Sequence, residues 1–290
     1  MSTISESRLI LHQFAAATHG EVATALPRIL FVPAMGVPAR FYEPFLSRLL
    51  ARGVAASACT LELPGQGAHP SRARRGDDYG YREVVEVLIP GAVQHLEDAM
   101  PTHPIVLIGH SLGAQLAVLA SAELASRVER FVLIAAGTAH WRRWPQAHRL
   151  RAAATIYAIA TAAAVLPWYP GVRLGFGGDQ SRRFMRDWSF NARSGRYRLS
   201  GSTTSPQELE QRLARVMTRV HLLGIDGDRV APTGASDELL AFLPQARLTR
   251  QTVTGVATDG PWRRHFSWAR HASDLDHAVA SQLAEVHCTR

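Results

Sequence analysis

The chain has 290 residues, of which 47% are hydrophobic and 19% charged, so it is large enough for one domain with a substantial core. This composition excludes long disordered segments. The net charge is +8, but the arginines occur in short scattered groups without a long basic run alternating with aromatic residues. The pattern does not indicate nucleic-acid binding, and it predicts either an arginine-rich surface or an anionic partner such as an acyl carrier or a phosphorylated substrate.

The cysteines and the apolar segments bear on the compartment. Cys59 and Cys288 are far apart and have neither metal-ligand spacing nor the pattern of a disulfide framework, which predicts a reduced, cytoplasmic setting. Residues 1–7 contain no basic segment followed by an apolar one, so no signal peptide is predicted. Residues 152–168 are the most membrane-like stretch, but they are short, weakly hydrophobic and broken by Pro167. We expect a buried or lid helix there and no stable membrane insertion.

The first half of the chain alternates between apolar runs typical of strands and segments with helical periodicity. Such alternation predicts an α/β fold, with a mostly parallel central sheet and helices on both faces. Predicted strands cover residues 9–14 (an antiparallel edge strand), 28–32, 54–63, 105–108 and 130–136, and predicted helices cover residues 41–50 and 81–100, the second bent or interrupted at Pro90-Gly91.

Ser111 lies between the buried strand at 105–108 and a helical segment, in the sequence Gly109-His110-Ser111-Leu112-Gly113. A strand, a tight turn with Gly-x-Ser-x-Gly and a helix together are typical of a nucleophile elbow. The two glycines leave room for a strained serine backbone, and the helix N-terminus points free N–H groups towards a developing negative charge. The alternative is an ordinary strand-to-helix turn with a capping serine.

Between residues 138 and 205 the alternation stops. This section is mostly helical, with an alanine-rich stretch at 140–166 and a shorter helix at 182–192, and it contains four of the six tryptophans. We expect a helical lid, residues 138–205, inserted into a sheet-containing core formed by residues 1–137 and 206–290, the alternative being additional core. The segment Gly175-Phe176-Gly177-Gly178 is not interpreted as a phosphate loop, because it follows no strand and lacks the full dinucleotide spacing.

The chain then returns to strands at 219–225 and 246–254, with helices predicted at 236–243 and 273–288. A serine nucleophile needs a base and an acid that orients the base, and on this type of fold they follow in the order serine, acid, histidine. His265, in a predicted loop after the last strand, is the favoured base over His271, which should begin the closing helix. Asp228 is the preferred acid because it stands four residues before Pro232, and Asp226 remains the alternative; either aspartate could instead stabilise the turn.

Two backbone N–H groups are the predicted oxyanion hole. One belongs to Leu112, which follows the nucleophile, and the other to Met35, in the loop after the strand at 28–32. Met35 could equally form only a wall of the pocket.

The motifs together resemble the α/β-hydrolase superfamily, and more narrowly a group of bacterial predicted hydrolases. The matching segments are Pro-Ala-Met-Gly at 33–36, Gly-His-Ser-Leu-Gly at 109–113, the Asp-x-Asp before Ala-Pro at 226–232 and His-Phe at 265–266. The resemblance implies the α/β-hydrolase fold and a Ser-His-Asp site, but no particular substrate. The chain departs from many relatives in having Pro33-Ala34 where they carry His-Gly, and Ala114 where they carry a further glycine.

The combined prediction is a serine hydrolase that cleaves an ester, lactone or thioester of a hydrophobic acyl substrate, free or carried by a partner, through an acyl-enzyme. An acyltransferase or cyclase using the same residues is one alternative. A ligand-binding or rearranging member of the fold that does not hydrolyse is another. No cofactor or metal is expected, because no zinc-ligand spacing, Walker motif or Rossmann motif occurs. The oligomeric state is left open.

Overall fold

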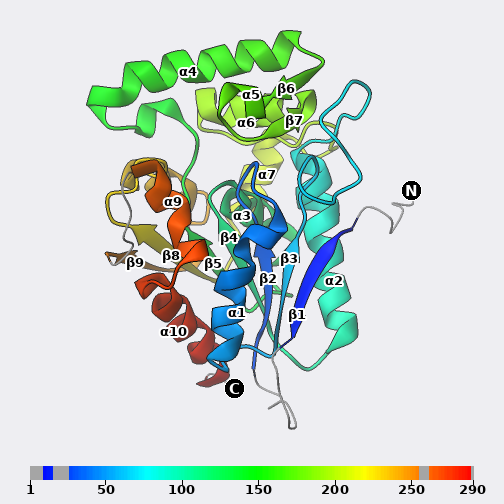
Figure 1. Ribbon diagram of the computed structural model, residues 1–290, viewed down its shortest axis with the longest axis vertical. Helices are drawn as coiled ribbons and strands as arrows, with labels where there is room; N and C mark the ends of the chain where they lie inside the picture. The colour runs from blue at the N-terminus through cyan, green and yellow to red at the C-terminus, as the bar shows by residue number, and fades with distance from the viewer. Residues whose placement is uncertain (1–8, 16–25, 255–260, 289–290) are drawn as a thin grey trace.

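The computed structural model describes residues 9–15, 26–254 and 261–288, so the predicted absence of a signal peptide at residues 1–7 lies outside the described residues. Within these ranges the chain forms a seven-stranded sheet in the order β1-β3-β2-β4-β5-β8-β9, in which only β1 runs antiparallel (Figure 1). The predicted mostly parallel sheet is therefore confirmed. The strands are β1 (Leu11–Ala15), β2 (Arg28–Val32), β3 (Ser57–Leu61), β4 (Ile105–His110), β5 (Arg130–Ile134), β8 (Arg219–Ile225) and β9 (Arg247–Val253).

The central strands are apolar on both sides because each side is covered by helices. In β2, Leu30 and Val32 join one buried cluster, whereas Ile29 and Phe31 join a second cluster on the opposite face. A strand turns successive side chains to opposite faces, so a continuous apolar run is what a sheet with two covered faces requires.

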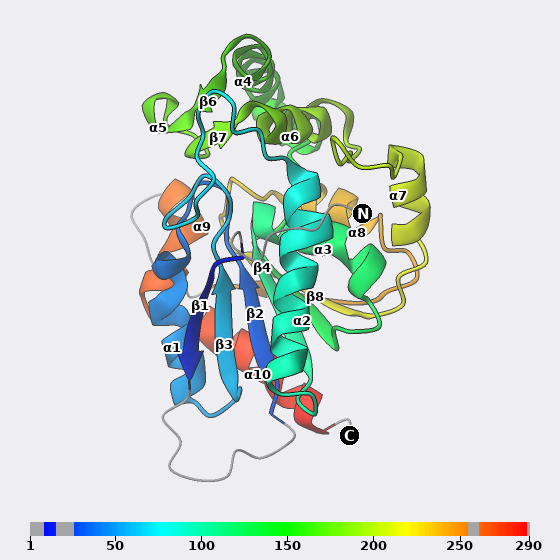
Figure 2. The same cartoon turned by 90° about the vertical axis from the view of Figure 1, so that its right-hand side faces the viewer.

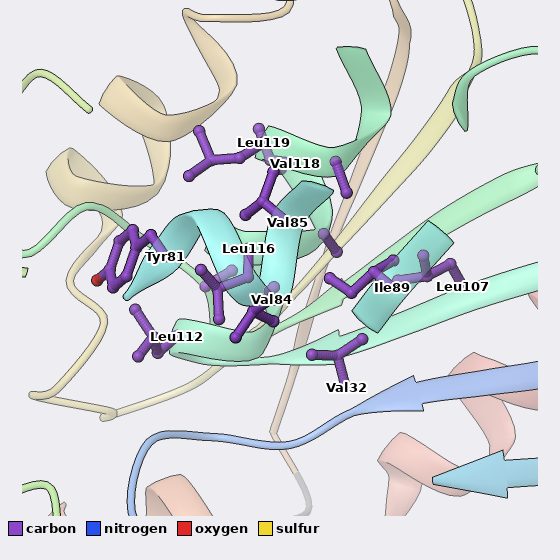
Figure 3. Close-up of a cluster of buried hydrophobic side chains, with 14 of the residues drawn as sticks. Val32, Tyr81, Val84, Val85, Ile89, Leu107, Leu112, Leu116, Val118 and Leu119 are labelled. Carbon is purple, nitrogen blue, oxygen red and sulfur yellow. The ribbon is translucent and has the colours of Figure 1, made fainter. Parts of the chain in front are cut away.

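Figure 2 shows α1 and α2 on opposite sides of the sheet. The first face is covered by α1 (Glu43–Ala51), α9 (Pro261–Arg270) and α10 (Asp274–Cys288), which contact one another or the strands. The second face is covered by α2 (Ile89–Ala99) and α3 (Leu112–Leu124), with α7 (Pro206–Leu213) packed on α3. Figure 3 shows the cluster beneath α2 and α3, in which the side chain of Leu112 is buried.

The helix predicted at residues 81–100 is disturbed before Pro90 rather than at it. Residues Glu83–Leu88 form a π-helical segment, which passes into α2, and the N–H of Ile89 donates to the carbonyl of Val84. Proline has no N–H and its ring clashes with the carbonyl four residues earlier. A wider turn before Pro90 accommodates the ring while the helix continues.

Between β5 and β8 the chain leaves the sheet and forms a separate layer above its carboxyl edge, with α4 as the outermost element in both views (Figures 1 and 2). Sequence periodicity anticipated the two long helices but missed the small hairpin between them. The elements of the layer are α4 (Gln146–Val165), β6 (Trp168–Pro170), α5 (Gly171–Leu174), β7 (Asp179–Ser181) and α6 (Arg182–Ser194). In the described part of the chain, none of the helices has both the length and the apolar character needed to span a bilayer.

Both ends of this layer are attached to the core by carboxylates. Glu238, on α8 (Thr233–Leu240), accepts hydrogen bonds from Thr138 Oγ1 at 2.6 Å and from Arg143 Nε at 2.7 Å. These bonds help to hold the pKa of Glu238 below its ordinary value although partial burial opposes the charge. At the other end, the buried carboxylate of Asp187 accepts from the backbone N–H of Tyr81 and from Arg198 Nε. The layer is therefore fixed to the core at its entry and at its return.

Candidate active site

Ser111 lies in the tight turn between β4 and α3, and its backbone is strained. Its φ is 53° and its ψ is −118°, a combination that residues other than glycine rarely adopt. The N–H of Ser111 donates to the carbonyl of Ile134 at 2.9 Å, and its own carbonyl accepts from the N–H of Ala114. These bonds hold the strained residue, which presents a half-buried hydroxyl without a hydrogen-bond partner among the described residues.

Gly109 and Gly113 are required because backbone lies where their side chains would be. A Cβ on Gly113 would meet the carbonyl oxygens of Val32 and Pro33 at 2.2 and 2.3 Å, and one on Gly109 would meet Ala114 Cα at 2.5 Å. Helix α3 therefore begins directly against the end of β2. The sequence-based reason for the two glycines is confirmed by this geometry.

Replacing Gly113 with alanine should lower the free energy of unfolding by about 2–3 kcal/mol, because the backbone of β2 has to move to admit the new Cβ. Urea unfolding followed by circular dichroism measures the change. The matched control is Gly91→Ala in α2, where the added Cβ meets only Leu9 Cδ2, at 3.8 Å. That variant should be unchanged or about 1 kcal/mol more stable, because alanine favours a helix. Equal stability of the two variants would contradict the packing argument.

The structure brings together His265 and Asp228. Nδ1 of His265 lies 2.7 Å from Oδ2 of Asp228, and both side chains are almost fully buried. The other oxygen of Asp228, Oδ1, accepts the N–H of Val230 at 2.8 Å. Because Nδ1 carries the proton that is donated to the carboxylate, Nε2 of the neutral ring is the acceptor. This buried Nε2 has no partner within the described residues.

Asp226 is not part of this contact. Its residue is exposed, and the guanidinium of Arg264 binds its main-chain carbonyl rather than its carboxylate. The N–H of Asp228 donates to the carbonyl of Ile225, and Gly227 within that turn has a φ of +70°. Because of this tight turn, the side chain of Asp228 points towards His265 whereas Asp226 is exposed to solvent, although the two residues are close in sequence.

His265 lies inside a helix, and the prediction of a loop at this position is wrong. Helix α9 begins at Pro261, whose fixed φ and missing N–H suit the first helical position. His265, Trp268 and Ala269 are buried while Arg270 is exposed, so the buried residues follow the spacing of three and four expected for a helix. That spacing in the sequence is the signal that could have identified α9. His271 lies between α9 and α10 and is exposed, away from the contact.

Helix α9 is held in place by one aromatic side chain and one arginine. Trp268 is completely buried, with its ring 4.9 Å from that of Phe45 and 5.0 Å from that of His110. Arg48, on α1, pairs with Asp276 at 2.7 Å and also donates to the carbonyls of Trp268 and His271. These contacts fix the end of α9 and thereby the position of His265.

The loop that follows β2 presents the predicted N–H of Met35. The N–H of Val37 donates to the carbonyl of Ala34, and Gly36 has a φ of +77°, so residues 34–37 form a turn of type II. Neither the Met35 N–H nor the Leu112 N–H donates a hydrogen bond within the described part of the chain. Both N–H groups therefore remain candidates for the predicted oxyanion hole.

A tyrosine that the sequence did not single out connects this loop to the turn at Ser111. The hydroxyl of Tyr42 accepts the N–H of Ala34 at 3.1 Å and shares a 2.8 Å hydrogen bond with Nδ1 of His110. Burial keeps the pKa of Tyr42 well above its ordinary value and that of His110 well below its ordinary value. The His110 ring contacts the ring of His265 in a tilted arrangement, with 4.7 Å between centroids and 40° between planes. No motif reports this bridge, because it joins residues far apart in the sequence.

The inserted layer contacts the Met35 loop through its glycines. A Cβ on Gly36 would lie 2.5 Å from the carbonyl carbon of Gly177, and one on Gly177 would lie 2.7 Å from Cε of Met35. The glycine-rich segment at 175–178 thus permits the backbone of the layer to approach the backbone of the Met35 loop closely. This packing role explains the glycines without a phosphate loop. Trp188, one of the four tryptophans of the layer, is buried in the core cluster, and the centroid of its ring lies 5.2 Å from that of Phe176. Among the described residues, no group of His, Cys, Asp and Glu side chains could hold a metal ion.

Comparison with known proteins agrees with this arrangement. The sequence pattern of the alpha/beta hydrolase family matches residues 29–260, which is most of the chain and includes β2, the Ser111 turn and β9. The chain belongs to the alpha/beta hydrolase family. The matched region ends just before α9, so the His265 helix lies outside it.

Solved structures of similar fold include several esterases and a thioesterase. This hydrolase is similar to the monoacylglycerol lipase of Paleococcus ferrophilus, with 14% identity, a TM-score of 0.62, and 96% of this chain and 99% of that chain covered. Est1E from Butyrivibrio proteoclasticus with bound ferulic acid has 14% identity and a TM-score of 0.60, with 97% and 96% covered. The thioesterase domain from the curacin biosynthetic pathway has 14% identity and a TM-score of 0.52, with 96% and 95% covered. At these identities the likeness concerns the fold alone, and no curated protein matches the hydrolase in sequence.

Proposed function

We propose that Ser111, His265 and Asp228 form a catalytic triad that cleaves a carboxylic ester, lactone or thioester. The observation that carries the proposal is the buried hydrogen bond between His265 and Asp228. His265 lies in α9, which packs against the turn that contains the strained Ser111. A serine hydroxyl is a weak nucleophile unless an oriented base accepts its proton. The His110 ring, one residue before Ser111, contacts the ring of His265, which supports a position of the base next to the turn.

In the proposed reaction, the Nε2 lone pair of His265 accepts the proton of Ser111 while the serine oxygen attacks the substrate carbonyl. The resulting imidazolium is stabilised by Asp228 through the 2.7 Å hydrogen bond. His265 then returns the proton to the leaving oxygen or sulfur atom, which leaves an acyl-enzyme. Water, activated by the same base, releases the acid. In the structure no hydrogen bond joins Ser111 and His265, and such bonds commonly tighten only when substrate binds.

The N–H groups of Leu112 and Met35 are proposed to stabilise the oxyanion. Leu112 begins α3, so its N–H also carries the positive end of the helix dipole. Its apolar side chain is buried on the other side of the turn, which leaves only the backbone for this role. The Met35 side chain touches Gly177, so Met35 would present its N–H to the oxyanion and its thioether to the inserted layer.

Residues 138–205 are proposed to act as a lid whose glycines close over the Met35 loop. Phe176, next to Gly177, and Met35 are partly buried apolar side chains at this junction. Apolar groups beside the oxyanion loop favour a hydrophobic acyl chain, whether the substrate is free or attached to a carrier. The lipase, Est1E and the thioesterase domain named above show that this fold can carry ester and thioester chemistry, whereas the preference for a hydrophobic chain rests on the apolar side chains at the junction.

Replacing Tyr42 with phenylalanine should lower kcat about tenfold with a smaller change in KM, because the N–H of Ala34 and Nδ1 of His110 lose their partner next to the oxyanion loop. Steady-state kinetics with p-nitrophenyl butyrate measures both constants. The matched control is Tyr81→Phe, because the buried hydroxyl of Tyr81 has no partner among the described residues. A parallel loss in the two variants would assign the effect to general packing and refute the bridge.

The proposed function is tested by labelling the wild-type protein with a fluorophosphonate and locating the adduct by peptide mass spectrometry. The expected adduct is on Ser111, and labelling should be blocked by an ester that turns over. A panel of p-nitrophenyl esters of increasing chain length then reports the acyl length that the site accepts. Product analysis with an added alcohol distinguishes hydrolysis from acyl transfer. A protein that neither labels nor turns over any ester would refute the proposal in favour of a ligand-binding role.

A further inference from the structure

Helix α4 is apolar on two opposite faces, although only one face is covered. Ile156, Ile159 and Ala163 are buried and face the layer beneath, where α4 packs on α6. On the outer side, Leu150 is 81% exposed and Val165 is 70% exposed. An apolar helix face normally packs against a partner, and the outer apolar side of α4 has none among the described residues.

The exposed apolar residues of α4 lie along one side, and the exposed Thr161, whose hydroxyl donates to the carbonyl of Tyr157, lies among them. At 100° per residue, Leu150, Tyr157 and Val165 point within about 80° of one another, and the exposed alanines between them occupy the same side. From Leu150 to Val165 the stripe is about 22 Å long at 1.5 Å per residue. The turn of α5 adds Val172 and Leu174, which are exposed apolar side chains of the same layer. We call the side chains of Leu150, Tyr157 and Val165 the α4 stripe.

The segment that contains the α4 stripe carries no acidic side chain of its own. Residues 138–178 contain no aspartate or glutamate. Among their arginines, Arg143 pairs with Glu238, but Arg151 and Arg173, which are both exposed, form no ion pair with a described residue. An apolar stripe flanked by unpaired arginines is complementary to a surface that is apolar inside and negatively charged outside.

We propose that the outer face of α4 docks on an anionic lipid surface. Arginine stems lie along apolar surface while the guanidinium groups reach phosphates, and tyrosine favours the headgroup level. The stripe lies on the outermost element of the fold, and no residue of α4 lines the surface cavities of about 610 and 510 Å³ (Figure 1). Because the stripe lies on the outside of the fold and not in a cavity, it can contact a broad lipid surface but offers no pocket for an inserted side chain of a protein partner. A second copy of this chain would bring like-charged arginines together.

The proposal is tested by sedimentation with vesicles of phosphatidylcholine alone and of phosphatidylcholine with about 30% phosphatidylglycerol. We expect the wild-type protein to bind the anionic vesicles at least about tenfold more tightly than the neutral ones, with a marked loss as salt is raised. Ser111→Ala should bind in the same way, because docking does not depend on the proposed chemistry. The result is thus independent of the outcome for the catalytic triad.

Variants on the stripe separate docking from general adhesion. Leu150→Gln combined with Val165→Gln should weaken binding to the anionic vesicles at least about tenfold, by removing the apolar contact. The matched control is Met217→Gln, since Met217 is 71% exposed but lies between α7 and β8, outside the inserted layer. Arg151→Gln should weaken binding about fivefold, whereas Arg215→Gln, an exposed arginine outside the layer, should change it little. Circular dichroism and ester turnover without lipid confirm that each variant is folded.

Three results would overturn the proposal. One is wild-type protein that does not bind anionic vesicles at low salt. Another is binding that the double substitution at Leu150 and Val165 leaves unchanged. The third is a different occupant: a dimer in sedimentation velocity, or a complex with an acidic acyl carrier protein, that the double substitution abolishes while vesicles remain unbound.

Discussion

Replacing Ser111 with alanine is expected to lower kcat for p-nitrophenyl esters about 10⁶-fold and to abolish labelling by a fluorophosphonate. Only Oγ is removed, so no acyl-enzyme can form. The N–H groups of Leu112 and Met35 remain, so a residual rate of about 10³ over the uncatalysed reaction should persist. Single-turnover and steady-state assays of purified protein, together with the labelling reaction, measure these effects.

The fold should survive this substitution, because the bonds that hold residue 111 come from its backbone N–H and carbonyl. Urea unfolding of Ser111→Ala checks this. Ser121→Ala is the matched control within the same helix, because Ser121 is a buried serine whose hydroxyl donates to the carbonyl of Val118. It should keep nearly full activity. If Ser111→Ala kept its labelling or its turnover, another residue would be the nucleophile and the proposed triad would be wrong.

Replacing Asp228 with asparagine should lower kcat about 10⁴-fold at neutral pH. In the structure, Oδ1 of Asp228 accepts the N–H of Val230, so the amide oxygen of asparagine would keep that place. Its NH₂ group would then face Nδ1 of His265 and donate to it. The imidazole would be forced into the tautomer with the proton on Nε2, which cannot accept the proton of Ser111.

Asp226→Asn is the matched control for this prediction, because it makes the same chemical change two residues earlier in the turn. Asp226 is exposed, so its substitution should alter kcat by less than about twofold. Kinetics of both variants, with thermal unfolding as a check on folding, decide between the two aspartates. A large loss in Asp226→Asn with little loss in Asp228→Asn would reverse the assignment of the acid.

These two carboxylates illustrate what sequence reasoning can reach. The pattern Asp-Gly-Asp after a buried strand predicts an acid at this edge of the sheet, because parallel strands end at one edge. It cannot tell which aspartate turns inward. That depends on the turn in which the N–H of Asp228 bonds Ile225 and Gly227 adopts a positive φ, together with the partner Val230. The spacing from Asp228 to Pro232 favoured the residue that the structure places beside His265.

Helix α9 illustrates a different limit. The order of residues along the chain predicted a histidine after the last strand, and His265 is the residue found beside Asp228. Its secondary structure was predicted wrongly, since the aromatic and arginine-rich segment has few aliphatic residues to signal a helix. Packing supplies what the local sequence lacks: Trp268 is enclosed by aromatic rings, and Arg48 binds the carbonyls at the end of the helix.

The sequence by itself determined the strands of the sheet, the site of the inserted layer and the need for glycine on both sides of Ser111. The strands and the layer follow from periodicity, which is a local property of a chain, and the glycines belong to a short motif that the sequence shows directly. Only the tertiary structure decided which aspartate faces His265, that Tyr42 joins the Met35 loop to His110, and that one apolar face of α4 is uncovered. Each of these depends on the directions of side chains from segments far apart in sequence, which only the packed fold brings into contact.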